Sequence, residues 1–398
     1  MNILFIIGGS DKGGVLTWLK YLAYELTKKS FVLSFAASIK GESYTSLKEY
    51  GEMHLLPFKS KGYNPKIIAG IPWYSLKKMI YNRGCKKNNS KEISKIIDKN
   101  EIDWVITIGF NDIPKLEVKR KRVQIISVLH TVPRIDTTPF KLKSRFIAYK
   151  LSKVDKVVSV GYVIIERLNK YLKEEIILIP NSCKDFSLSK DKKKAIKEEL
   201  NIPLDSKCIG SLGRFSRPKG FLELIKIFNT LALGHPNLHC VLGGSPFSEM
   251  EHEYFKDVKN LAVNSPYSNR IHFLGNVNNE DFYPIIDIYL LISINSIESF
   301  GLVAIEAMSS NIPVVATGIG GPLEIIEHNK TGFLVYNNRI EDFSKFVSYL
   351  LLSNDLYTKI ANNGREAYLN RFTNEIWVTK WLHLFETLGN SNNNYSNY

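Results

Sequence analysis

The chain has 398 residues, of which 44% are hydrophobic, so it is too long for one ordinary hydrophobic core and has enough apolar residues for two. Its cysteines, Cys85, Cys183, Cys208 and Cys240, are scattered and form no CxxC pair, which argues against zinc and disulfide sites and favours a reducing, cytoplasmic setting. No stretch approaches the roughly 18 apolar residues of a membrane span, and the start "MNILFIIGGS" predicts a buried strand instead of a signal peptide.

The net charge of +14 is spread unevenly along the chain. Residues 1–190 contain 34 Lys and Arg against 17 Asp and Glu, whereas the remaining residues contain 19 against 22. A basic half could serve nucleic acid, an anionic membrane surface or a phosphorylated ligand, and it could also reflect a genome biased toward Lys and Asn. Charge alone therefore leaves the partner open.

Short apolar runs alternate with amphipathic stretches along the first half of the chain. Such alternation is typical of a parallel sheet covered by helices on both faces. We therefore expect a Rossmann-like α/β domain at residues 1–185. Its strands are expected at residues 2–8, 31–38, 103–109, 123–130, 156–161 and 175–181, with the first helix at 15–29.

The second half repeats this scheme, which predicts a second Rossmann-like domain at residues 186–372. A charged stretch at 184–200 suits a connector or an exposed first helix, a helix at 373–390 is expected to cross back to the first domain, and 391–398 is expected to be a disordered tail. Ligands of open α/β sheets bind beyond the carboxyl ends of the strands, so two such domains facing each other would form a cleft. Strands are expected at 207–214, 238–244, 271–277, 287–294, 312–321 and 332–337, and helices at 220–233 and 301–311.

The segment "SIESFGLVAIEAM" places Glu298 just after a buried strand and Glu306 inside the following helix. On one helix the two acids would lie about 12 Å apart, too far to share a proton transfer. In a loop and a helix they can instead hold different hydroxyls of one elongated ligand, whose anionic part lies against the free N–H groups of Phe300, Gly301 and Leu302. The alternative is an ordinary helix with Glu298 as a capping charge and Glu306 on a solvated face.

The segment "GSLGRFSRPKG" also follows a buried strand and precedes an amphipathic helix. It brings Arg214, Arg217 and Lys219 to a loop at the carboxyl end of that strand, and Gly213 and Gly220 permit close backbone approach. A guanidinium fork and an ammonium group suit a diphosphate, although basic loop residues are often merely solvated. Both loops together favour a nucleotide sugar as the ligand.

Four segments in this order resemble the second domain of the large family of retaining glycosyltransferases of GT-B fold, usually called family 4. They are "GRFSRPKG", "ESFGLVAIEAM", "NIPVVATGIGGPLEII" and "NKTGFLV", within residues 207–335. The resemblance implies a GT-B fold and transfer of a sugar from a nucleotide sugar with retention of anomeric configuration. The sequence departs from the family pattern at "IPNSCK", where Ser182 replaces the usual glycine, and in "GGPLE", where the proline lies one place early.

The resemblance also implies roles for single residues of the second domain. Arg214 and Lys219 would bind the donor diphosphate, Glu306 the ribose, and Glu298 the hydroxyls of the transferred sugar. The backbone amides of Phe300, Gly301 and Leu302 would lie near the donor. Glu324 would belong to a loop on the nucleotide side, or it would simply cap its own helix.

The first domain resembles the family more loosely. "GGSDKGGVLTWLKYLA" is similar to the family's first glycine loop, which implies that Gly13 and Gly14 approach the donor phosphate or the acceptor, and it lacks the G-x-G-x-x-G spacing of an NAD site. His130 ends a buried strand at the position where similar enzymes keep a histidine facing the reacting sugar. A lone histidine can also be an ordinary core or surface residue.

The expected chemistry needs no metal or other cofactor. Loss of a nucleoside diphosphate puts negative charge on the departing phosphate, which Arg214, Lys219 and the helix N-terminus would stabilise. No acidic pair with the character of metal ligands follows a strand. A front-face substitution fits the absence of an obvious nucleophile, with His130 orienting the sugar.

Basic aromatic segments at residues 64–87 and 139–156 combine apolar and cationic side chains at partly helical spacing. They could lie on anionic lipid at the inner face of the plasma membrane, or they could be ordinary amphipathic helices. The first alternative fits a lipid-linked glycan acceptor in the synthesis of bacterial surface polysaccharide. Two competing interpretations are a nucleotide-sugar epimerase and a nucleic-acid-binding protein; the lack of an RNP-like strand argues against the second.

Overall fold

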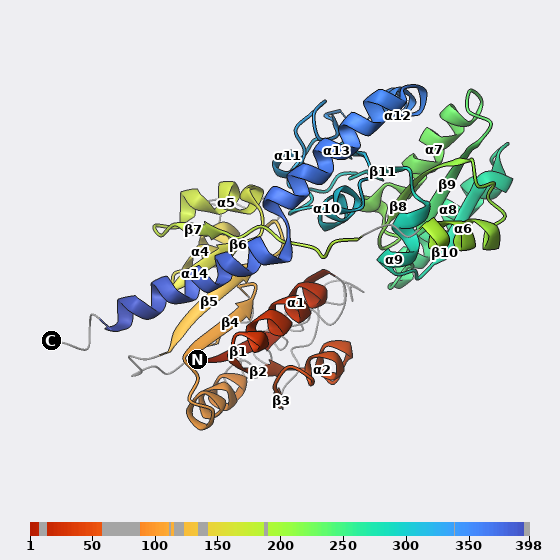
Figure 1. Ribbon diagram of the computed structural model, residues 1–398. Helices are drawn as coiled ribbons and strands as arrows, with labels where there is room; N and C mark the ends of the chain where they lie inside the picture. Colours follow the sequence, from red (N-terminus) through yellow and green to blue (C-terminus); the bar gives the residue numbers. More distant parts are fainter. Residues whose placement is uncertain are drawn as a thin grey trace. The chain divides into compact units, whose positions relative to one another are not determined.

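The computed structural model describes residues 1–7, 14–57, 88–110, 113–114, 123–133, 142–186, 190–337 and 339–393. The chain forms two compact units (Figure 1). The N-terminal unit comprises Met1–Ile179 and Val378–Tyr398, and the C-terminal unit comprises Pro180–Trp377. The domain boundaries expected from the sequence lie after residues 185 and 372, so each differs from these limits by several residues.

The N-terminal unit contains a parallel sheet in the order β3-β2-β1-β4-β5-β6-β7. Its inner strands are buried on both faces, which explains their nearly continuous apolar sequences. The strands are β1 (Asn2–Ile7), β2 (Val32–Ala37), β3 (Glu52–Leu55), β4 (Trp104–Ile108), β5 (Gln124–Leu129), β6 (Lys156–Ser159) and β7 (Ile176–Leu178).

Helices flank this sheet. The buried apolar residues of helix α1, from Leu16 to Leu26, recur at helical spacing. They form one apolar face, with which the helix packs against the sheet. A further helix runs over residues 88–99. The others are α2 (Glu42–Leu47), α4 (Leu142–Leu151), α5 (Tyr162–Leu168) and the 3₁₀ turn η2 (Asn169–Tyr171).

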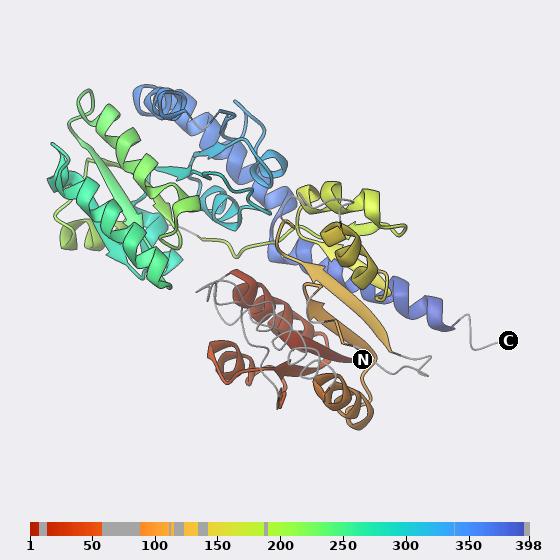
Figure 2. The ribbon, with the colours of Figure 1, turned by 180° about the vertical axis from the view of Figure 1, so that it is seen from behind.

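The C-terminal unit, seen from behind in Figure 2, also contains a parallel sheet with helices around it. Its strand order is β10-β9-β8-β11-β12-β13. In both sheets the strand order reverses beside the first strand, at β1/β4 and β8/β11, and such switch points are where open α/β sheets bind ligands. The strands are β8 (Lys207–Leu212), β9 (Leu238–Gly243), β10 (Ile271–Gly275), β11 (Ile288–Leu291), β12 (Val314–Thr317) and β13 (Phe333–Val335).

Two groups of helices accompany the second sheet. Helices α7 (Phe221–Ala232), α8 (Glu249–Val263) and α12 (Ile340–Leu352) share one apolar cluster with it. The other helices and turns are α6 (Lys190–Glu199), η3 (Arg217–Lys219), η4 (Ser268–Arg270), α9 (Asn279–Phe282), η5 (Tyr283–Ile285), α10 (Leu302–Ser309), α11 (Pro322–Ile325) and α13 (Asn354–Arg371).

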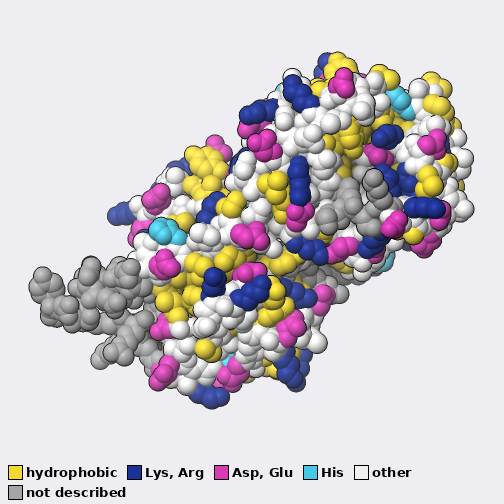
Figure 3. Space-filling model, viewed as in Figure 1, with side chains coloured by type: hydrophobic (Ala, Val, Ile, Leu, Met, Phe, Trp, Pro, Cys, Tyr) yellow, Lys and Arg dark blue, Asp and Glu magenta, His cyan; other side chains and the backbone are white. Residues whose placement is uncertain are grey.

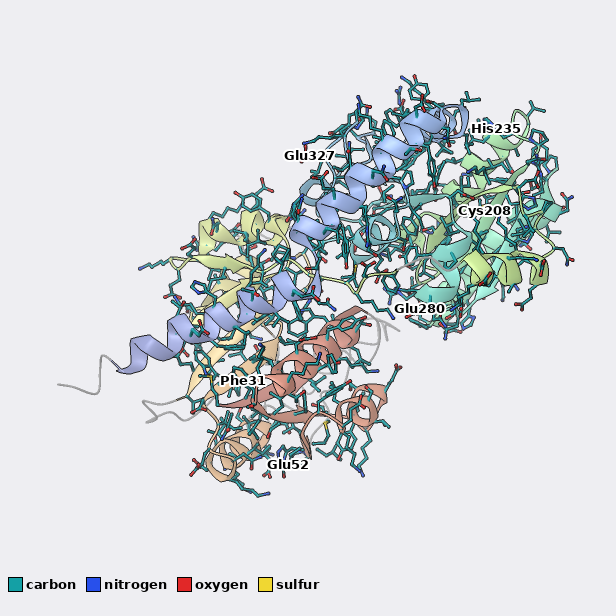
Figure 4. All side chains as sticks on the ribbon, viewed as in Figure 1. Phe31, Glu52, Cys208, His235, Glu280 and Glu327 are labelled. Atoms are coloured by element: carbon teal, nitrogen blue, oxygen red, sulfur yellow. The ribbon has the colours of Figure 1, made fainter. Side chains whose placement is uncertain are left out.

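Helix α14 (Asn374–Asn393) begins in the C-terminal unit and continues into the N-terminal one. Its Phe385 contacts Trp104 of β4 and Phe31, which is labelled in Figure 4, and its Trp381 contacts Trp18 of α1. Residues 391–393 of the expected tail continue this helix, and 394–398 lie outside the described residues.

The prediction of two parallel α/β sheets is confirmed, and the charged stretch at 184–200 contains helix α6. Strand β3, "EMHL", was not predicted, because an edge strand of four mostly solvent-facing residues carries little apolar pattern.

No helix in the described parts of the chain combines the length and apolar character needed to cross a membrane. Basic and acidic side chains are interspersed on the face shown in Figure 3.

Candidate functional site

The loops that follow β8 and β11 meet in an ion pair within the C-terminal unit. Lys219, at the end of η3, donates from Nζ to Oε2 of Glu298 over 2.7 Å. The N–H of Ile294 also donates to the carbonyl of Pro218, which joins the two loops through their backbones. The sequence predicted that each of these charged groups follows a buried strand, and the structure shows that the two strands, β8 and β11, are neighbours in one sheet.

Gly220 allows this approach. It has a left-handed backbone with φ of +62°, and a Cβ there would lie 2.4 Å from Cγ2 of Ile292. A side chain at this position would therefore strain the turn and push the basic loop away from β11. Gly213 differs, because a Cβ there would meet nothing within 4 Å.

The glycine pair Gly320–Gly321 packs directly against the backbone of the Glu298 loop. The N–H of Gly321 donates to the carbonyl of Glu298 over 2.9 Å. A Cβ on Gly321 would lie 1.9 Å from the carbonyl oxygen of Phe300, and one on Gly320 would lie 2.4 Å from that of Glu298. The two glycines thus fix the loop by backbone contact that no other residue type permits.

Helix α10 begins at this loop. Gly301 is its N-cap with φ of +106°, and no side chain caps the helix. The N–H groups of Phe300, Gly301 and Leu302 donate to no acceptor among the described residues, as expected at a helix N-terminus. Phe300 itself is buried and packs edge-on against Phe372. The arrangement leaves amide hydrogens and the positive end of a short helix beside Glu298.

Glu306 lies one turn into α10 and is only 5% exposed, so the alternative that placed it on a solvated face is wrong. The hydroxyl of Tyr283 donates to its Oε2 over 2.8 Å. Burial raises the pKa of Glu306 from 4.5 to about 7, and hydrogen bonds from Tyr283 and Asn279 oppose that rise. The carboxyl group therefore titrates close to neutral pH.

Arg214 has a different partner from Lys219. Its Nε lies 3.2 Å from Oε1 of Glu251, the residue that completes the capping box at the start of α8. Arg217 lies over the ring of Tyr254 on the same helix. The predicted binding of one diphosphate by Arg214 and Lys219 together stays a prediction.

His130 follows β5 in the N-terminal unit. Its ring packs edge-on against Trp18, with centroids 4.6 Å apart, and its Nε2 is buried with no hydrogen-bond partner among the described residues. Burial lowers the pKa of His130 from 6.5 to about 4, so the imidazole is neutral at physiological pH. Gly14 is the first residue of α1, and Gly13 lies outside the described residues.

Three contacts at these loops were not predicted from the sequence. They are the bond from Tyr283 to Glu306, the pair of Arg214 with Glu251, and the packing of Gly320–Gly321 on the Glu298 loop. Of these three contacts, only the last could have been recognised from the sequence, because two adjacent glycines after a buried strand indicate a turn with close backbone approach. Glu324 lies in α11, where its backbone carbonyl accepts from Arg371.

No group of three or more His, Cys, Asp or Glu side chains in the described part of the chain could hold a metal ion. Cys183, Cys208 and Cys240 are free thiols. Within the C-terminal unit, the described groups at these loops that can act on a ligand are the ammonium of Lys219, the guanidinium of Arg214, the carboxyls of Glu298 and Glu306, and backbone amides.

Comparison with protein families gives a match to glycosyl transferases group 1 over residues 192–367, all within the C-terminal unit. An uncharacterized glycosyltransferase of Haemophilus influenzae is 32% identical over 164 residues, which cover 41% of this chain and 44% of the relative. The lipopolysaccharide core biosynthesis glycosyltransferase LpsE of Rhizobium meliloti is 27% identical over 187 residues, 47% of this chain and 52% of the relative. The chain thus matches about half the length of these relatives.

Solved structures match over nearly the whole chain. Alr3699/HepE of Anabaena in complex with UDP gives a TM-score of 0.80 at 17% identity and covers 97% of this chain and 100% of that one. The likeness shows a shared fold, that of GT-B glycosyltransferases, with two Rossmann-like domains.

Proposed function

We propose that this chain, whose C-terminal unit carries the domain of glycosyl transferases group 1, transfers a sugar from a nucleoside diphosphate sugar to a hydroxyl of a glycan acceptor. The observation that carries the proposal is the 2.7 Å pair of Lys219 and Glu298 beside the amide-rich start of α10. A cation, an anion and free amides within one pair of loops match the phosphates and hydroxyls of such a donor.

The reaction breaks the bond between the anomeric carbon and the diphosphate oxygen and forms one to the acceptor oxygen. Negative charge develops on the departing diphosphate, where Lys219 and the N-terminus of α10 stabilise it. Arg214 is the second cation in this proposal and exchanges Glu251 for phosphate. Glu298 binds hydroxyls of the transferred sugar and Glu306 those of the ribose.

We place His130 next to the reacting sugar. With a pKa of about 4 the imidazole is neutral, so it orients the sugar by hydrogen bonding and does not act as a charged acid. The acceptor hydroxyl then passes its proton to the departing phosphate on the same face of the sugar, which retains the anomeric configuration. No divalent metal takes part.

The acceptor in this proposal is a lipid-linked glycan used in bacterial surface polysaccharide synthesis at the inner face of the plasma membrane. The name of the relative LpsE supports it. So does helix α4, which exposes Phe146 and Tyr149, with Lys150 and Lys153 lying over their rings. Exposed aromatics among lysines suit an anionic lipid interface. Residues 64–87, and 139–141 of the second basic segment, lie outside the described residues.

A thermal-shift panel of UDP, GDP, ADP and their sugars tests the donor. A ligand that binds only the folded state raises the melting temperature, and we expect one nucleotide class to do so. Lys219→Met should reduce that shift at the same ligand concentration, whereas Lys226→Met, which removes an exposed lysine from α7, should keep it. If no nucleotide stabilises the wild-type chain, the proposal is wrong.

Flotation with anionic vesicles tests the membrane part separately. We expect the wild-type chain to float and the double variant Phe146→Ser/Tyr149→Ser to remain in solution. Absence of flotation by the wild-type chain would remove the membrane contact and leave the donor chemistry untouched.

A further inference from the structure

A buried tyrosine holds one oxygen of the Glu306 carboxyl. Tyr283, the first residue of η5, is fully buried, and its hydroxyl lies 2.8 Å from Oε2 of Glu306 and 3.3 Å from the carbonyl oxygen of Val303. Both acceptors belong to α10, so the hydroxyl ties η5 to the helix on which Glu306 lies. One carboxyl oxygen is thereby fixed in place.

The ring of Tyr283 cannot reorient without disturbing its neighbours. It packs against the rings of Phe186, Phe282 and Tyr289, with centroids between 5.5 and 6.1 Å away. These contacts involve only the ring, so they survive removal of the hydroxyl. Replacing Tyr283 by Phe therefore deletes the hydrogen bond to Glu306 and preserves the packing.

We propose that Tyr283 is a positioning residue for donor binding: its hydroxyl holds Oε2 of Glu306 so that the carboxylate presents its other oxygen to the ribose of the nucleotide sugar. This inference rests on the proposed function, because it gives Glu306 the ribose as ligand. A hydrogen bond to a carboxylate favours the charged form, which accepts ribose hydroxyls more strongly than the neutral acid does. Tyr283 thus acts on both the direction and the charge of Glu306.

Among the described residues, three titratable groups from other elements interact with Glu306, and all three are neutral near pH 7. Burial raises the pKa of Tyr283, of Tyr289 from β11 and of Cys183 from the segment before α6. Asp185 and Arg365 lie beyond Cys183 and pair with each other. Glu306, with a pKa of about 7, is the group of this cluster that changes charge near neutrality.

The direct test is the titration of Glu306 in the ligand-free chain carrying glutamate labelled with ¹³C at the carboxyl carbon. The Glu306 signal is assigned by its absence in Glu306→Gln. In Tyr283→Phe we expect its midpoint to rise by about one pH unit, a tenfold change in proton affinity. Tyr289→Phe is the matched control, because its hydroxyl bonds to the backbone of Leu212 and not to Glu306, and it should leave the midpoint in place.

The second test is nucleotide affinity by calorimetry, with whichever of UDP, GDP and ADP binds the wild-type chain. In Tyr283→Phe we expect binding at least about fivefold weaker at pH 7, where fewer Glu306 groups are ionised and the carboxylate is no longer held in place, and a clearly smaller loss at pH 9, where only the second effect remains. A pH-independent loss of affinity would indicate a purely structural role and overturn the inference. An unshifted Glu306 midpoint would also overturn it. Failure of the wild-type chain to bind any of the three contradicts the proposed function, while the titration still decides whether Tyr283 controls Glu306.

Discussion

His130 in the N-terminal unit and Glu306 in the C-terminal unit are ionisable groups just beyond strand ends, the first with a buried Nε2 and the second buried as a whole side chain. Burial favours the neutral form of each, and so it lowers the pKa of His130 to about 4 and raises that of Glu306 to about 7. They differ in their partners. Glu306 has hydrogen bonds that counteract burial, whereas Nε2 of His130 has none among the described residues.

The comparison shows that one physical effect has opposite consequences for stability. Between pH 6.5 and 4 the unfolded state binds the proton of His130 more readily, so His130 lowers stability as the pH falls through this range. Between pH 4.5 and 7 the folded state holds the proton of Glu306 more readily, so Glu306 lowers stability as the pH rises. Glu306, which has hydrogen-bond partners, is therefore partly ionised near neutral pH. His130, whose Nε2 has no partner among the described residues, is neutral there.

The largest effect is expected for His130→Ala. If the imidazole contacts the reacting sugar, kcat should fall by roughly 100- to 1,000-fold with little change in donor KM. In the wild-type chain, kcat should show no step from His130 between pH 5.5 and 8, because its pKa is about 4. Steady-state kinetics against pH measure both.

The control for this variant is His383→Ala, which removes an exposed histidine from α14 in the same unit. It should retain full activity. A wild-type kcat that titrates near pH 6.5 and loses that step in His130→Ala would contradict the neutral imidazole.

The next effect concerns Lys219. Lys219→Met should weaken nucleoside diphosphate binding about 10- to 100-fold, because it removes a charge-assisted bond to phosphate. The substitution should lower the free energy of unfolding by less than about 1 kcal/mol, because the ion pair of Lys219 with Glu298 is partly exposed and is screened by solvent. Calorimetry and urea unfolding separate the two quantities. If the variant loses as much free energy of unfolding as it loses free energy of nucleotide binding, Lys219 has only a structural role.

Glu306→Gln should stabilise the chain at pH 8 by about 1–3 kcal/mol, because it removes the cost of ionising a buried carboxyl. The amide oxygen still accepts from Tyr283. At pH 4.5 the gain should disappear, because the wild-type carboxyl is then protonated in the folded state. Urea unfolding at both pH values measures this, and an equal gain at both would refute the raised pKa.

The smallest effect is expected from metal removal. Transfer activity in excess EDTA should equal that in buffer, because the proposal assigns charge stabilisation to Lys219, Arg214 and the start of α10. Restoration of lost activity by Mg²⁺ or Mn²⁺ would show that the leaving diphosphate needs a metal ion as well.

The two sheets could be predicted from the sequence because buried parallel strands are nearly uninterrupted apolar runs. The positions of Glu298 and Lys219 at the carboxyl ends of strands could be predicted because each residue lies in a loop that directly follows such a run. The sequence did not predict the partners of Glu306 and Arg214. Tyr283 and Glu251 lie on other elements, and which side chain reaches which depends on packing between them. Apolar periodicity carries no information about such pairs.

The two units are not separable at a single point in the chain. Helix α14 supplies Trp381 and Phe385 to the aromatic cluster of the N-terminal unit, and Trp381 packs on the same Trp18 that contacts His130. A fragment that ends before Val378 would lack these rings and would expose to solvent the apolar surface that they cover. Co-expression of residues 1–179 with a peptide of residues 374–393 should therefore yield more folded protein than residues 1–179 alone. A substitution of Trp381 should disturb His130 through the edge-on contacts of Trp381 with Trp18 and of Trp18 with His130.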